Sequence, residues 1–194
     1  MFSALVLSTV VIFVAELGDK SQLMAMTFAT RYRARDVILG ITAATAIVHL
    51  ASVGIGYFIG ASFERYQGPI AIAAGIAFLG FAAWTLRGDE LTDEEAQKAR
   101  KAKGSALLAV GLAFFLAELG DKTMLATITL AVREDWLGTW IGSTVGMVAA
   151  DALAIGVGAL LGRKLPEKVI QYGAAAAFAI FGLVLVAEGA GWLG

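Results

Sequence analysis

The stretch Ala15-Glu16-Leu17-Gly18-Asp19-Lys20 places three charged residues inside an apolar segment that extends from Phe2 to Thr30. The same six residues return 102 positions later as Ala117-Glu118-Leu119-Gly120-Asp121-Lys122, inside a second apolar segment. The register continues without a gap, so that Thr27 matches Thr129 and Gly60 matches Gly162. Chance would supply matches between small residues in a chain rich in Ala and Gly, but not a charged hexapeptide. The chain therefore contains two copies of one unit.

The chain as a whole is too apolar for a soluble domain. Of its 194 residues 59% are hydrophobic and 16% are charged, and its mean hydropathy is +0.79. Soluble domains carry about 45–50% apolar and about 25% charged residues. Because a helix needs about 20 mostly apolar residues to cross a bilayer, we predict an all-α integral membrane protein with six transmembrane helices. These helices are expected at Phe2–Thr30, Val37–Gly60, Pro69–Leu86, Ala106–Val132, Leu137–Gly162 and Val169–Trp192.

The duplication divides the chain into a first repeat at residues 1–86, a charged linker at 87–104 and a second repeat at 105–194. Each repeat contains three spans, and because three is odd the second copy enters the membrane from the opposite side. The sequence thus predicts two inverted three-helix repeats. Many secondary transporters have this plan and hold their substrate near the membrane midplane, at the repeat interface. The linker lacks the spacing and turn glycine of an EF-hand, and we predict a solvated helix there.

Basic residues are distributed unequally between the two sides of the predicted bundle. The connections after the first, third and fifth spans carry 11 Lys and Arg residues, whereas the opposite side carries only Arg65 and Arg133. Cytoplasmic loops are enriched in Lys and Arg, which predicts that these three connections are cytoplasmic and that both termini lie outside. The N-terminal apolar run is not preceded by the Lys or Arg of a signal peptide, so we expect it to be retained.

The charged residues of the two hexapeptides lie deep inside predicted spans. A charge at the bilayer centre costs at least about 2.5–3.5 kcal/mol, so these groups are expected to face the protein interior or a cavity. Residues three and four apart share one face of a helix, which would place Glu16, Asp19 and Lys20 on the same side as Thr27. Gly18 and its repeat mate would leave room for close backbone approach or let the helix unwind locally. Two such faces meeting between the repeats would bring together four carboxylates: Glu16, Asp19, Glu118 and Asp121.

A carboxylate cluster of this kind suits a hard divalent cation, because Ca²⁺, Mn²⁺ and Mg²⁺ prefer oxygen ligands. With Lys20 and Lys122 the four carboxylates carry a net charge of −2 when all are ionised, which one divalent cation or two protons would neutralise. Protons and cations compete for crowded carboxylates. The resulting hypothesis is antiport of a divalent cation against protons. The structural alternative, in which the charges only stabilise helices, is disfavoured by the presence of two related copies.

His49 and Asp151 are further titratable residues within predicted spans, and the repeat register pairs them with each other. Either would relay protons or fill a coordination position. The alternative is that each forms a hydrogen bond with a neighbouring helix.

Three polar residues adjoin the hexapeptides. Ser21 and Thr123 would supply hydroxyl ligands, or they bond the backbone of their own helices as Ser and Thr often do. Gln22 is matched by Met124 and is a third supporting candidate. A thioether near the site would favour Mn²⁺ over Ca²⁺, although methionine is more often ordinary packing.

The residues from Glu16 to Ser21 and from Glu118 to Thr123 resemble the paired E-φ-G-D-[KR]-[TS] signatures of one membrane family. That family includes the Golgi calcium/manganese transporter linked to glycosylation, its chloroplast relatives and bacterial manganese exporters. Both copies fit at all six positions, and the duplicated three-span plan is similar over nearly the whole chain. The resemblance implies exchange of Ca²⁺ or Mn²⁺ for protons. It implies cation ligation by Glu16, Asp19, Glu118 and Asp121, with support from Lys20, Lys122, Ser21 and Thr123.

The resemblance also bears on location and direction. Eukaryotic members carry an N-terminal extension that this sequence lacks, so the chain is most similar to a bacterial plasma-membrane member. For such a member the resemblance implies export of the cation from the cytoplasm, driven by inward proton flow. It assigns no role to His49 or Asp151.

Other function classes fit the sequence less well. An exporter of small organic solutes, such as cationic amino acids, is the main alternative, because it would use a similar duplicated plan. An enzyme is not expected: the chain has no Cys and one His, so no Ser-His-Asp or two-His metal set can be assembled. No cofactor is expected beyond the transported Mn²⁺ or Ca²⁺. The partners are the cation, protons and the lipid bilayer, whereas the net charge of −1 argues against a nucleic acid, and a homo-oligomer is left open.

Overall fold

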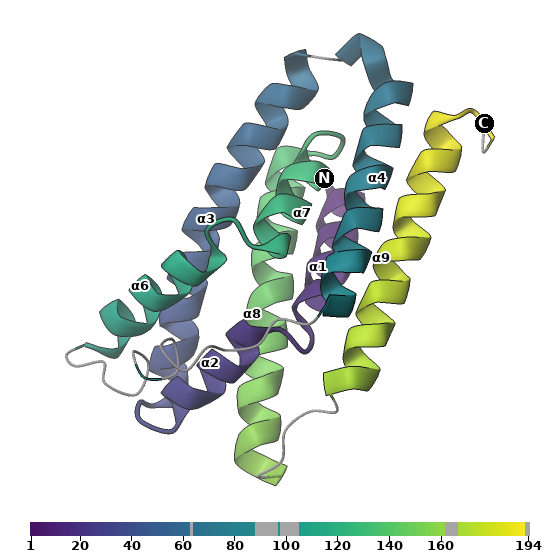
Figure 1. Ribbon diagram of the computed structural model, residues 1–194. Helices are drawn as coiled ribbons and strands as arrows, with labels where there is room; N and C mark the ends of the chain where they lie inside the picture. The colour runs from purple at the N-terminus through teal and green to yellow at the C-terminus, as the bar shows by residue number, and fades with distance from the viewer. Residues whose placement is uncertain (63, 88–96, 98–104, 162–166, 193–194) are drawn as a thin grey trace.

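The computed structural model describes residues 1–62, 64–87, 97, 105–161 and 167–192. All regular structure among these residues is helical (Figure 1). The helices are α1 (Phe2–Glu16), α2 (Lys20–Ala29), α3 (Ala34–Ser62), the 3-10 helix η1 (Glu64–Tyr66), α4 (Gln67–Arg87), α6 (Ala106–Glu118), α7 (Lys122–Ala131), α8 (Trp136–Leu161) and α9 (Glu167–Gly189). The charged linker predicted at 87–104 lies almost wholly outside the described residues.

The sequence repeat is also a repeat of helix boundaries. Helices α2 and α7 begin and end 102 residues apart, α1 and α6 end 102 residues apart, and α3 and α8 begin 102 residues apart. A common offset at four boundaries means that the same local signals start and stop the helices in both copies.

Four helices, α3, α4, α8 and α9, are long and apolar enough to cross a membrane. Helices α1 and α2 form a fifth candidate span if the bent pair is counted as one, and α6 is a shorter apolar helix. The prediction of one helix from Phe2 to Thr30 is wrong, because the chain bends by 79° between α1 and α2. The predicted span Ala106–Val132 is likewise divided into α6 and α7. The protein is thus an all-helical, multi-pass membrane protein.

The helices of each repeat pack on helices of the other repeat. Helix α1 packs on α8 of the second repeat, α6 packs on α3 of the first, and α4 packs along α9. Gly142 on α8 lies against the backbone of Leu5 and the side chain of Ser8, and its repeat mate Gly40 lies against Val110, the mate of Ser8. Equivalent contacts thus hold equivalent helices.

The α4–α9 pair crosses at two glycines. A Cβ atom on Gly75 would lie 2.6 Å from the Gly182 carbonyl oxygen, and one on Gly182 would lie 2.8 Å from that of Gly75. Only hydrogen side chains allow the backbones to approach this closely. The small-residue tracts Ala71–Gly80 and Gly173–Gly182 thus allow α4 and α9 to pack closely at this crossing.

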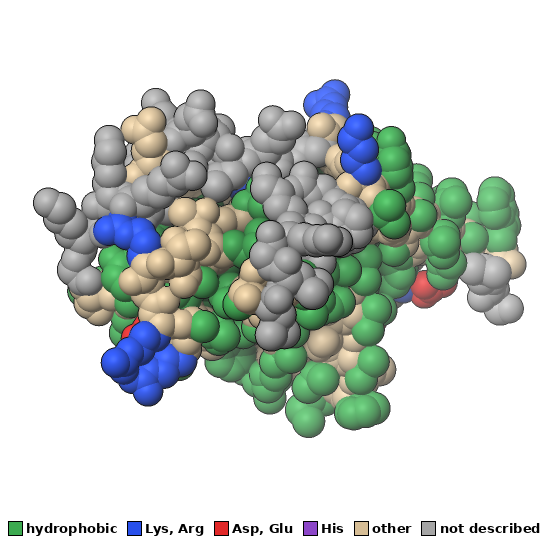
Figure 2. Space-filling view, turned by 90° about the horizontal axis from the view of Figure 1, so that it is seen from below, with side chains coloured by type: hydrophobic (Ala, Val, Ile, Leu, Met, Phe, Trp, Pro, Cys, Tyr) green, Lys and Arg blue, Asp and Glu red, His purple; other side chains and the backbone are tan. Residues whose placement is uncertain are grey.

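The turns and helix ends lie at the two opposite ends of the helical bundle. In Figure 1 the α2–α3 turn and the C-terminal end of α8 lie at the lower end, whereas the α3–α4 turn and the C-terminal end of α9 lie at the upper end. Figure 2 views the lower end, where Lys and Arg side chains protrude, and Arg31, Arg33 and Arg35 of the α2–α3 turn are exposed. Which end faces the cytoplasm stays a prediction from the distribution of basic residues.

Candidate cation-binding site

Each hexapeptide forms a break between two helices. Glu16 is the last residue of α1, Leu17 is extended, and Gly18 has a φ of 77°, in the left-handed region that favours glycine. Asp19 then caps α2 by accepting a hydrogen bond from the Ser21 backbone N–H at 3.3 Å. An Asp at this position satisfies one of the unpaired N–H groups at the helix start.

The second hexapeptide repeats this geometry. Glu118 ends α6, Gly120 has a φ of 79°, and Asp121 caps α7 by accepting from the Thr123 backbone N–H at 3.3 Å. The local sequence therefore encodes the break itself. A Gly-Asp pair followed by Ser or Thr inside an apolar run is a start signal for a new helix, and this signal could have placed both breaks.

The breaks overturn one prediction about the site. Glu16 and Asp19 do not share a helical face with Lys20 and Thr27, because α1 ends at Glu16 and α2 begins only at Lys20. The Thr27 hydroxyl instead donates to the Leu23 carbonyl of its own helix at 2.8 Å. The alternative considered from the sequence, local unwinding at the glycine, is confirmed.

A hydroxyl group links the two acids of each motif. In the first motif the Ser21 hydroxyl lies within hydrogen-bond distance of both Glu16 Oε1 and Asp19 Oδ2. In the second, Thr123 Oγ1 lies 2.8 Å from Glu118 Oε2 and 3.3 Å from Asp121 Oδ2. Ser21 and Thr123 therefore position the acids across each break.

The two motifs meet in the folded chain. Lys122 Nζ forms an ion pair with Asp19 Oδ1, and both side chains are at least 95% buried. Lys122 also lies within electrostatic range of Glu16 and Asp121. This contact between the repeats brings the predicted acidic residues into one buried region. Lys20, the repeat mate of Lys122, is half-buried.

Helix α8 adds a fifth acid to this region. Asp151 is fully buried, and neither of its carboxylate oxygens has a hydrogen-bond partner among the described residues. It lies within electrostatic range of Glu16, Asp19 and Glu118. Glu16 Oε2 is also buried without a hydrogen-bond partner.

His49 occupies the matching position on α3. It is fully buried, and within the part of the chain that the structure describes neither ring nitrogen has a hydrogen-bond partner. The sequence register therefore paired two residues that are both buried and unsatisfied in the fold.

Gln22 and Met124 occupy matching positions but make different contacts. The Gln22 side chain accepts from the Gly18 N–H at 2.8 Å and donates to the Ala150 carbonyl of α8 at 2.8 Å. Met124 Sδ accepts from the Gly120 N–H at 3.2 Å. Gln22 thus ties the first break to α8 next to Asp151, a contact that sequence reasoning missed because the partner is a backbone carbonyl 128 residues away.

These side chains form a buried acidic region, but they are not arranged as the coordination shell of a metal ion. Within the part of the chain that the structure describes, no three His, Asp or Glu side chains come close enough together to hold a metal ion. What the arrangement supplies is a buried set of carboxylate and hydroxyl oxygens, the ligand type that hard divalent cations prefer.

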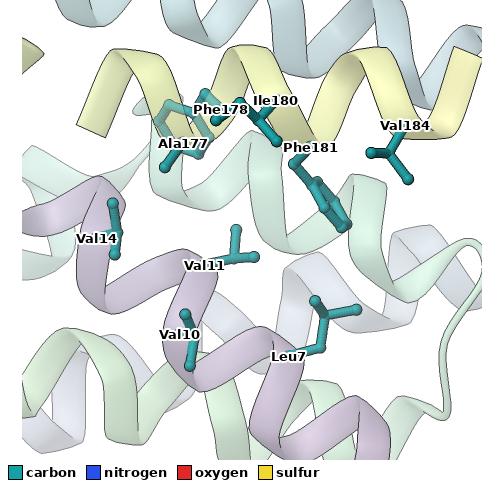
Figure 3. Close-up of a pocket in the computed structure, with 9 residues that line it drawn as sticks. All are labelled: Leu7, Val10, Val11, Val14, Ala177, Phe178, Ile180, Phe181 and Val184. Atoms are coloured by element: carbon teal, nitrogen blue, oxygen red, sulfur yellow. The ribbon is translucent and has the colours of Figure 1, made fainter. Parts of the chain in front are cut away.

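A separate apolar groove lies between α1 and α9 (Figure 3). It has a volume of about 370 Å³, and its lining includes Leu7, Val11, Phe178 and Phe181. None of the residues that line it is charged. The groove is therefore not the cation site.

Comparison with known proteins identifies the family. The model of the family described as "Divalent cation/proton antiporter GDT1" matches residues 4–93 and 106–192 of the chain. The chain belongs to the GDT1 family. A Vibrio cholerae protein whose name proposes that it is a manganese exporter is 32% identical, over 94% of this chain and 90% of its own length.

Other GDT1 relatives come from photosynthetic organisms. A GDT1-like protein of Synechocystis is 28% identical over 95% of this chain and 97% of its own length. The Arabidopsis thaliana protein named PAM71-homolog, chloroplastic, is 33% identical over 88% of this chain, which spans 55% of that relative's length. No solved structure matches the chain.

Membership of the GDT1 family confirms the resemblance drawn from the hexapeptides. The family consists of transporters, not enzymes, so the protein is a multi-pass membrane protein of cation transport. The roles of the individual site residues stay predictions.

Proposed function

We propose that this protein exchanges a divalent cation, Mn²⁺ or Ca²⁺, for protons and exports the cation from the cytoplasm. The observation that carries the proposal is the buried ion pair between Lys122 and Asp19, which joins the two motifs. Because it brings acids of both repeats into one region, a single cation entering there is within reach of both. The GDT1 family description supports exchange against protons.

Glu16, Asp19, Glu118 and Asp121 are the proposed cation ligands. Since no three acids of the described residues are close enough to hold an ion, ligation by several of them requires their side chains to converge. A cation that binds Asp19 also has to displace Lys122 from it. We infer that this exchange of partners is one step of the transport cycle.

The proposed architecture gives the site access from both sides. If α1–α2 and α6–α7 each cross the membrane once as bent spans, the chain has six crossings in two inverted repeats. The matched helix boundaries of the two copies support this arrangement. We propose that both termini lie outside a bacterial plasma membrane, and the distribution of Lys and Arg supports this orientation.

Purified protein in proteoliposomes would test the proposal. The vesicles contain a dye sensitive to Mn²⁺ or Ca²⁺, and a pH gradient is imposed in either direction. We expect flux of one or both ions that follows the pH gradient in the wild type and is abolished in Glu16→Gln and Asp121→Asn. Glu188→Gln is the matched control, because Glu188 is half exposed and pairs with Arg133 at the end of α9.

The same experiment distinguishes cation exchange from the main alternative, the export of small organic solutes. Flux of neither ion in the wild type, under either gradient direction, would reject cation exchange and favour export of organic solutes. Transport of arginine or lysine that Mn²⁺ does not inhibit would support that second function class.

A further inference from the structure

Asp151 is a buried acid that the paired motifs leave unexplained. It lies on α8, outside both hexapeptides, and its side chain has no exposed surface. Both of its oxygens lack a hydrogen-bond partner. Buried polar groups in folded proteins are nearly always hydrogen-bonded, and an exception calls for a reason.

The position of Asp151 beside the first motif is fixed by neighbouring contacts. Helix α8 packs along α1 and also contacts α2. The Gln22 side chain donates to the carbonyl of Ala150, the residue before Asp151, at 2.8 Å. The same Gln22 accepts from the Gly18 N–H in the break. One side chain thus connects the first break to the turn of α8 that carries Asp151.

The charges around Asp151 are of its own sign. Asp19, Glu16 and Glu118 act on it electrostatically, and the nearby ammonium group of Lys122 is paired with Asp19. Glu16 contributes a second buried oxygen, Oε2, without a hydrogen-bond partner. Unpaired carboxylate oxygens of Glu16 and Asp151, which belong to different helices and are buried in the same region, would both gain a partner from a positive ligand bound between them.

We propose that Asp151 is a ligand of the transported divalent cation, so that the cation binds beside the first motif, between Glu16 and Asp151. The inference rests on the proposed cation exchange and refines it. The second motif has no matching acid, because the residue at the equivalent position of α3 is His49. The two halves of the site are therefore unequal, and the acid-rich half is formed by α1, α2 and α8.

The test uses the full-length protein in detergent, with MnCl₂ as the probe. Binding is measured by titration, and thermal unfolding is followed with and without Mn²⁺. Because even an outer-shell partner of a metal ligand is worth about 10–100-fold in affinity, we expect Asp151→Asn to weaken Mn²⁺ binding at least about 100-fold. Asp151→Glu, which keeps the carboxylate, is expected to recover part of the affinity. Ser143→Ala, a buried change on α8 at a side chain that bonds its own helix, is the control.

Thermal unfolding distinguishes a ligand from a structural residue. A cation that binds only the folded state raises the unfolding temperature. We expect Asp151→Asn without Mn²⁺ to be at least as stable as the wild type, because an unpaired buried carboxylate has been removed, and to lose the rise produced by Mn²⁺. Lower stability in both Asp151→Asn and Asp151→Glu, with weakened binding in both, would show a structural role and overturn the inference.

The two proposals fail in different ways. Wild-type affinity in Asp151→Asn would reject Asp151 as a ligand and leave the proposed exchange intact. Absence of Mn²⁺ and Ca²⁺ binding in the wild type would overturn both.

Discussion

The break between α1 and α2 and the break between α6 and α7 are built alike but stand in different surroundings. Gly18 and Gly120 have φ values of 77° and 79°, and the Asp after each caps the next helix with the same 3.3 Å hydrogen bond. A hydroxyl lies between the two acids in each motif. The backbone of the break therefore depends on the motif and not on its neighbours.

The neighbours differ at two matched positions. The first break lies within electrostatic range of Asp151 on α8 and is tied to α8 by Gln22, whereas the residue of α3 that matches Asp151 is His49 and the residue of the second motif that matches Gln22 is Met124. Duplication thus kept the local geometry while the charges contributed by the packing helix diverged. Unequal halves of this kind can give one cation a preferred side within a nearly symmetric scaffold.

Ser21 and Thr123 carry the hydroxyls that link the two acids of each motif. Among the changes that compare the two breaks, removal of these hydroxyls is expected to have the largest effect on Mn²⁺ binding. We expect Ser21→Ala to weaken Mn²⁺ binding by about 100-fold and Thr123→Ala by about 10-fold, the two ends of the range for groups that orient metal ligands. The larger loss is expected at Ser21 because the cation is proposed to bind beside the first motif. Mn²⁺ titration of the purified variants measures both values. Ser21→Thr, which copies the second motif, is the control, and a larger loss in Thr123→Ala than in Ser21→Ala would contradict the assignment.

Matched glycines test the packing between repeats. A Cβ on Gly142 would clash with the backbone of Leu5, whereas a Cβ on Gly40 would lie 2.9 Å from the Val110 side chain. We expect Gly142→Ala to lower the stability by about 1–3 kcal/mol, the usual cost of overpacking, and Gly40→Ala to cost less because its shortest contact, 2.9 Å to Val110 Cβ, is longer than that of a Cβ on Gly142 with the Leu5 carbonyl oxygen. Thermal unfolding in detergent compares them.

The controls for this pair are Gly54→Ala and Gly156→Ala. These two residues are also 102 positions apart, and apart from the backbone of its own helix and its chain neighbours no atom of the described residues lies within 4 Å of a Cβ at either. Neither change should destabilise the protein, because Ala is favoured over Gly in a helix by up to about 1 kcal/mol. Equal stability loss at Gly40 and Gly142 would show that the two interfaces do not differ.

Exchanging the residues at the matched polar position should have the smallest effect. Gln22→Met keeps an acceptor for the Gly18 N–H but loses the bond to the Ala150 carbonyl. The expected cost is about 0.5–1.5 kcal/mol, the net value of one hydrogen bond. Met124→Gln, which places a stronger acceptor near the Gly120 N–H, should not destabilise the protein. Thermal unfolding that ranks the two variants in the opposite order would show that Gln22 does not hold the first break to α8.

Several features of the site could be predicted from the sequence because their causes are local. The repeat, the apolar helices and the acids of both motifs follow from residue type and spacing. The Gly-Asp-Lys-Ser and Gly-Asp-Lys-Thr stretches also contain the helix breaks. The prediction of a single helix at Phe2–Thr30 was wrong because it relied on the apolar run. It gave too little weight to the left-handed preference of Gly18 and the capping preference of Asp19.

The sequence by itself determined that the protein is a membrane protein with two copies of a broken, acid-bearing segment, because hydropathy, glycine conformation and helix capping act over a few residues. Only the tertiary structure decided which charged groups meet. Lys122 pairs with Asp19 across 103 residues, and Asp151 lies within electrostatic range of Glu16 only because α8 packs on α1. Such meetings depend on where helices cross, and those crossings are set by close contacts such as Gly142 against Leu5 that involve the whole fold.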